Sequence, residues 1–97
     1  MNVYEDVNRA ARASLPALVA RWLPQGRREG REYVARNPKR HDRRSGSFKV
    51  NLDTGRWADF ATGDKGGDVV SLAAYLFGLR QGEAAERVAA ALGVEAR

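Results

Sequence analysis

The residues best suited to take part in chemistry are basic, and they gather in the middle of the chain. Residues 27–56 contain ten Lys and Arg against four Asp and Glu, whereas the rest of the chain contains seven against eight. The positive excess of this 97-residue chain, +5 in total, therefore lies in one third of the sequence. A local basic excess is typical of a surface that binds phosphate groups. The alternative is a solvated face that only keeps a small protein soluble.

Catalytic chemistry has little support in the sequence. His41 is the only histidine and there is no cysteine, so the usual nucleophile–base pairs and a thiolate zinc site cannot form. Asp59, Asp64 and Asp68 offer carboxylates for Mg²⁺. A turn residue at Asp64 and a helix cap at Asp68 explain two of them more simply. The sequence therefore predicts a non-enzyme with no metal and no cofactor.

A glycine-rich turn, GDKGG at 63–67, precedes an apolar segment that Asp68 opens. The turn lacks the Ser or Thr that follows Lys in a nucleotide-binding P-loop, and it does not match G-x-G-x-x-G. Lys65 and the first N–H groups of the following helix can still meet a phosphate of a nucleic acid. The turn thus predicts a phosphate contact and not a nucleotide site.

The stretch 45–77 predicts, in order, a hairpin, a glycine turn and a capped helix. Residues 47–52 and 56–61 are strand-like and flank a turn that ends at Gly55. On the return strand, Trp57 and Phe60 are three residues apart, so a regular strand places them on opposite faces. An aromatic ring on an open face beside arginines can stack on a base. The alternative, with both rings buried, stays open at this point.

The flanking segments predict helices and one further strand. Residues 3–23 repeat apolar side chains with a helical period, and Pro16 after Ser14 predicts a kink or two short helices. A Gly- and Arg-rich linker at 25–30 then leads to a candidate strand at 31–36 and a basic loop at 39–44. Residues 82–92 predict a last helix that ends at Gly93.

We therefore expect one α+β domain over residues 1–97. It has an N-terminal helical segment (1–24), a small antiparallel sheet of about three strands with a basic loop (31–62), and two C-terminal helices (68–93). No apolar run approaches about 18 residues, and the N-terminus lacks the apolar core of a signal peptide. Because cysteine is also absent, we expect a cytoplasmic protein without a membrane contact.

Residues 37–76 resemble the zinc-binding N-terminal domain of bacterial and phage DNA primases, of the CHC2 type. SFKV at 47–50, WADFATG at 57–63 and GGDVVSL at 66–72 resemble, in order, the family's Ser-Phe-x-Val strand, its aromatic strand with a Cys-x-x-Cys knuckle, and its glycine turn and apolar helix. Asn37 stands in the place of the first cysteine, and Asp59 and Thr62 stand in the places of the knuckle cysteines. The family's histidine falls near Arg40 or His41. The resemblance implies a zinc-ribbon-like sheet without zinc, held by ordinary packing.

The same resemblance implies a role in DNA replication. The GDKGGD turn resembles versions of this domain at the front of plasmid and phage primase–helicase proteins, whose polymerase core and helicase motor are missing here. It implies a non-catalytic, single-stranded DNA-binding domain or accessory protein of a mobile element, with a primase–polymerase or a replicative helicase as partner. One alternative is a protein-interaction adaptor for such a partner without DNA affinity. Another is a metal-dependent nuclease or nucleotidyl transferase that uses Asp64.

Nine residues are predicted to contact the nucleic acid. Basic side chains of the loop, the hairpin and the glycine turn would hold phosphates, and one ring, that of Trp57, would stack on a base. The predicted residues are Arg36, Lys39, Arg40, Arg43, Arg44, Lys49, Arg56, Trp57 and Lys65.

Overall fold

The computed structural model describes residues 3–39 and 47–93 of the chain. Over these two ranges the chain forms four helices and five strands. The helices are α1 (Val3–Arg12), α2 (Leu15–Trp22), α3 (Val69–Phe77) and α4 (Gln81–Leu92). The strands are β1 (Arg27–Glu29), β2 (Glu32–Ala35), β3 (Phe48–Asn51), β4 (Trp57–Asp59) and β5 (Lys65–Gly66). The predicted α+β class is confirmed.

The strands form one antiparallel sheet in which each strand pairs with the next along the chain. Within the described residues the sheet has five strands, so the prediction of about three was wrong. The segment predicted as a linker contains β1, which pairs with β2 across Gly30, and a φ of +62° there suits a two-residue hairpin turn. The glycine-rich turn contains β5, which pairs with β4.

The N-terminal helical segment is broken where the sequence predicts. The first helix ends at Arg12 and the second begins at Leu15, with Pro16 in its first turn, where a missing N–H costs no hydrogen bond. The hydroxyl of Tyr33 on β2 donates a hydrogen bond of 2.7 Å to the carbonyl of Leu23, directly after α2. This contact fixes α2 to the sheet.

The third helix is held at its start by two side chains. Asp68 Oδ1 accepts a hydrogen bond of 2.8 Å from the N–H of Ser71, as predicted for a cap. Asn8 of α1 accepts a second, of 3.0 Å, from the N–H of Val70. Gly78 ends the helix with a φ of +64°. Because α1 contributes one of the caps, α1 and α3 are joined at this point.

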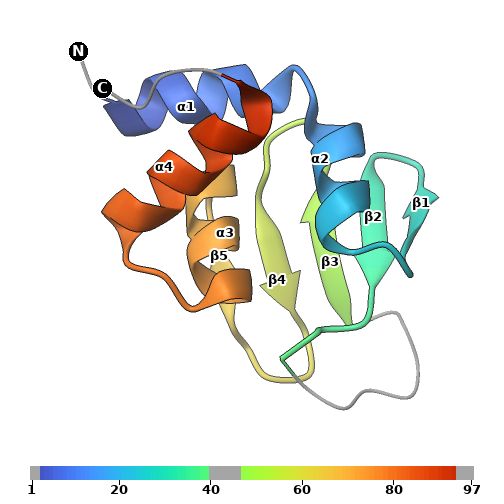
Figure 1. The fold of residues 1–97 in the computed structure, drawn as a ribbon. Coiled ribbons are helices and arrows are strands. Elements are labelled where there is room, and N and C mark those ends of the chain that lie inside the picture. The colour runs from blue at the N-terminus through green and yellow to red at the C-terminus, as the bar shows by residue number, and fades with distance from the viewer. Residues whose placement is uncertain (1–2, 40–46, 94–97) are drawn as a thin grey trace.

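Figure 1 shows the helices on one face of the sheet, and the apolar core lies between them and that face. Among its fully buried side chains are Phe48 of β3, Leu15 of α2, Leu72 of α3 and Val88 of α4. Each layer therefore contributes to a single cluster. No helix of residues 3–39 and 47–93 lies on the other face of the sheet (Figure 1). In the described parts of the chain, no helix has both the length and the apolar character needed to cross a membrane.

Candidate nucleic-acid interface

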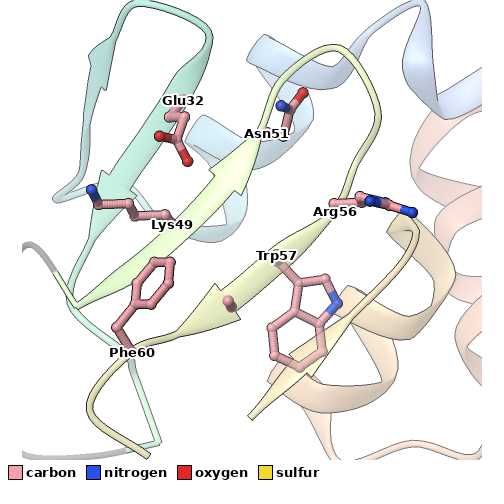
Figure 2. A pocket seen from close by; sticks show the side chains of 7 residues that line it. Glu32, Lys49, Asn51, Arg56, Trp57 and Phe60 are labelled. Carbon is pink, nitrogen blue, oxygen red and sulfur yellow. The ribbon is translucent and has the colours of Figure 1, made fainter. Parts of the chain in front are cut away.

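The two faces of the sheet differ in composition because side chains alternate along each strand. The face toward the helices, here called the covered face, carries Tyr33, Val50 and Trp57, which the register places opposite one another. The other face, here called the open face, carries Lys49 and Ala58, which also lie opposite one another. Figure 2 views the sheet from its open face, with the helices behind it.

A line of residues crosses all five strands on the open face. Directly opposed residues of antiparallel strands point to the same side, and the register aligns, in order, Arg27, Val34, Lys49, Ala58 and Lys65. Every second residue in this cation row is basic, so the three charged side chains start about 10 Å apart, given a strand spacing of about 4.8 Å. Such a spacing suits successive contacts with an extended anionic polymer.

The exposed aromatic residue beside this row is Phe60, whose side chain is 71% exposed. It directly follows β4, and its N–H bonds the carbonyl of Ser47 at 2.8 Å, so the strand pattern continues through it. The ammonium of Lys49 lies 5.7 Å from the centre of its ring. A phenyl ring held next to a lysine, with its surface open to solvent, can stack on a base while the lysine contacts a phosphate.

Trp57 lies on the covered face, so the base-stacking role predicted for it was wrong. The residue is 6% exposed, and its indole N–H donates a hydrogen bond of 2.9 Å to Ser71 Oγ. Its ring packs against Phe48 and Tyr75, with centroid distances of 5.8 and 4.6 Å. A ring enclosed in this way has little free surface for a base. The predicted opposition of Trp57 and Phe60 holds, and Phe60 is the exposed member of the pair.

A shallow hollow lies on the open face between β2, β3 and β4 (Figure 2). Its volume is about 210 Å³, which is below the roughly 300 Å³ at which small-molecule pockets begin. The residues that line it are Glu32, Lys49, Asn51, Arg56, Trp57, Ala58 and Phe60. Its shape therefore fits one planar group at the surface better than an enclosed substrate.

The other residues that were predicted to contact nucleic acid fall into three groups by their location. Arg36, Arg56 and Lys65 are exposed, and Arg56 borders the hollow. Lys39 lies apart from the cation row, because its ammonium is 4.7 Å from the centre of the Tyr75 ring on α3. The predicted contacts Arg40, Arg43 and Arg44, like His41, lie outside the described residues.

Sequence reasoning missed Arg27, Glu32 and the position of Phe60 as the exposed ring. The signal for the first two was present, because Gly30 between charged residues can form a two-residue hairpin turn. That hairpin brings Arg27 onto the open face opposite Val34. Assigning the exposed ring requires the register of the hairpin, which places Trp57 opposite the apolar Val50 and so leaves Phe60 on the other face.

A buried polar cluster lies where β2 ends and β4 turns toward β5. The Asn37 side-chain amide donates hydrogen bonds of 2.7 Å to Asp59 Oδ2 and 2.8 Å to the hydroxyl of Tyr75. That hydroxyl in turn donates one of 2.8 Å to Asp64 Oδ2. Asp59, which is fully buried, also accepts a hydrogen bond from the N–H of Ala61 at 2.8 Å. The cluster therefore fixes the chain on both sides of Phe60.

The pKa of Tyr75 in this cluster is raised above its ordinary value of 10.0. Burial is the largest cause, because it disfavours the phenolate. The hydrogen bond to Asp64 and the negative charges of Asp64 and Asp59 raise the pKa further, while the bond from Asn37 opposes them. Tyr75 therefore keeps its proton, which the bond to Asp64 requires.

The residues in this cluster do not fit the zinc ion that the resemblance implies. Zinc requires four ligands, mostly thiolate or imidazole, whereas Asn37, Asp59 and Thr62 supply an amide, a carboxylate and a hydroxyl. The amide and the carboxylate bond to each other, and the Thr62 hydroxyl accepts from the N–H of Asp64 at 3.2 Å. Among residues 3–39 and 47–93 there is no group of three His, Cys, Asp or Glu arranged to hold a metal.

The start of α3 is a weaker anion site than the sequence predicts. Side chains already occupy two of its leading N–H groups, those of Val70 and Ser71. Lys65, predicted to contact a phosphate from the same turn, instead lies on β5 in the cation row. The basic side chain of the glycine turn thus lies on the sheet and not at the helix end.

Comparison with known proteins gives no relative from which a function could be transferred. No family model matches the chain, and no curated protein matches it in sequence. The function must therefore be inferred from the geometry of the open face and from the resemblance of residues 37–76 to the primase domain.

Proposed function

We propose that this protein binds single-stranded DNA on the open face of its sheet, as a non-catalytic domain or accessory protein of a primase or helicase replication system in a plasmid, phage or other mobile element. The observation that carries the proposal is the cation row beside the exposed ring of Phe60. The two features together offer contacts to both the phosphates and the bases of an unpaired strand.

The geometry favours a single strand over a duplex for a simple reason. In a duplex the faces of the bases are stacked on one another, whereas an unpaired strand leaves them free to stack on a protein ring. Phe60 offers one such ring, and Lys49 and Lys65 make no ion pair with another described residue. Their charges are therefore available for phosphates.

The replication setting rests on the resemblance, and two features support it. The order of hairpin, glycine turn and capped helix follows the family pattern. Asn37 and Asp59, which stand in the places of two cysteines, are in contact at 2.7 Å. A zinc-ribbon-like arrangement would bring those two places together in this way. The expected protein partner is a primase–polymerase or a replicative helicase.

Fluorescence anisotropy with a labelled single-stranded oligonucleotide over a range of salt concentrations tests the DNA-binding part. Each single-strand phosphate that is neutralised contributes about −0.7 to the slope of log K against log salt, so Lys49→Gln with Lys65→Gln should flatten the slope by about 1.4. The matched control, Arg12→Gln with Arg21→Gln, removes the same charge from exposed positions on α1 and α2. It should leave the slope nearly unchanged.

Two results would contradict the proposal. Equal slopes for the two double variants would show that charge acts without regard to position, and so would exclude the open face as the interface. No affinity for any oligonucleotide at low salt would exclude DNA binding altogether. That second result would favour the adaptor, whose basic face meets an acidic protein partner.

A further inference from the structure

The open face carries a carboxylate whose place the fold does not explain. Glu32 is half-buried at the hollow beside Lys49 (Figure 2), yet it makes no ion pair with another described residue. Two of the nearby cations have other partners: Arg27 bonds Glu29 at 2.7 Å, and the ammonium of Lys49 lies over Phe60. Glu32 is therefore left facing the hollow.

The position of Glu32 in its strand is also unfavourable for stability. Glu32 lies directly opposite Glu29 across the β1–β2 hairpin, and like charges in that arrangement destabilise a sheet. Glutamate is in addition a poor strand former. Residues that are unfavourable for their secondary structure, and that gain nothing in packing, are concentrated at functional sites.

The hollow is suited to bind one base. Ala58, which lies opposite Lys49, lines it with a small side chain. Phe60 stands at one end and Glu32 at the other (Figure 2). A base stacked on Phe60 would present its edge to Glu32 and Asn51. The Asn51 oxygen already accepts hydrogen bonds from the N–H groups of Asp53 and Thr54 at 2.8 and 3.0 Å, which leaves its NH₂ group as a donor.

We infer that Glu32 selects the base that enters this hollow, by accepting a hydrogen bond from an exocyclic amino group. This inference rests on the proposed DNA binding and adds a preference among bases to it. Cytosine presents an amino donor where thymine presents a carbonyl oxygen. A carboxylate accepts from the first and repels the second, so the hollow should prefer cytosine over thymine.

The test compares two matched probes, oligo-dC and oligo-dT of equal length, by fluorescence anisotropy at neutral pH. The two bases are similar in size, so the ratio of their affinities isolates the edge contact from phosphate binding. The unchanged protein should prefer oligo-dC by about fivefold, the lower end of what base-edge hydrogen bonds give. Glu32→Thr should bring the ratio close to one, and so should Glu32→Gln, whose amide can also donate to thymine.

Glu29→Thr is the control, because it removes the same charge from the same hairpin at a residue that does not line the hollow. It should strengthen binding to both probes alike and keep the preference for oligo-dC. A ratio near one in the unchanged protein, or a ratio that Glu32→Thr leaves unaltered, would overturn the inference while DNA binding stands. Absence of affinity for both probes would overturn the proposed function as well.

Discussion

The two faces of the sheet are built from the same strands, yet they differ in almost every property. Along β3, Phe48 and Val50 are fully buried on the covered face, while Lys49 between them lies on the open face. Along β4, Trp57 enters the core, and three residues later Phe60 is exposed. Alternate residues of one short segment thus face the core and the solvent. Substitutions on the two faces should therefore have separable effects, and their effects on stability can be ranked.

The largest effect on stability is expected for Phe48→Ala. The ring is fully buried and stacks with Trp57 and Tyr75 at centroid distances of 5.8 and 6.1 Å. Its removal leaves a cavity between sheet and helix, which should cost about 3–5 kcal/mol of unfolding free energy. Urea unfolding followed by tryptophan fluorescence measures this. Lys49→Ala, the next residue, should change stability by only about 0.5 kcal/mol. Equal losses from the two variants would refute the division into faces.

A smaller effect, which is present at neutral pH and fades in alkali, is expected for Tyr75. Its pKa is raised in the folded protein, so the unfolded chain releases the phenol proton first as the pH rises. The stabilising contribution is fully present below pH 10.0, the ordinary value, and is lost as the pH rises through the folded pKa. Ionisation would remove the hydrogen bond to Asp64 and place a negative charge beside Asp59.

Thermal unfolding from neutral to strongly alkaline pH, for the unchanged protein and Tyr75→Phe, checks this. The phenylalanine variant should be less stable by about 1 kcal/mol at neutral pH, the net value of a hydrogen bond. The gap between the two should narrow above pH 10.0, because only the unchanged protein loses this contribution. If the difference in stability between the two proteins did not change with pH, ionisation of the Tyr75 hydroxyl would have no effect on folding.

The parts of the fold that were predictable depend on local chemistry. Pro16 separates two helices, Asp68 caps α3, and Gly78 ends it, each through contacts within a few residues along the chain. β1 and β5 were missed because strands of three and two residues carry too little pattern of their own. They exist because a neighbouring strand offers hydrogen-bond partners.

The candidate site was predicted less well, for a reason that is also physical. The sequence separates Trp57 from Phe60 by face, but the register of the hairpin, which pairs Trp57 with Val50, decides which ring is buried. The polar cluster was missed because Asn37 meets Asp59 and Tyr75 across 22 and 38 residues of chain. The resemblance implied ordinary packing in that place. The fold instead uses hydrogen bonds between polar groups that no short motif contains.

The smallest effect on stability, and the sharpest test of the comparison, is expected for Phe60→Ala. Because the side chain is 71% exposed, its removal should change the unfolding free energy by only about 0.5 kcal/mol. The affinity for single-stranded DNA should nevertheless fall by about 1–3 kcal/mol, the contribution of one stacked base. Urea unfolding and anisotropy on the same samples measure both quantities. Phe60→Trp is the matched control, because it enlarges the exposed ring and should keep or strengthen binding. If the alanine variant bound as well as the unchanged protein, the exposed ring would have no part in recognition, and the open face would act through charge alone.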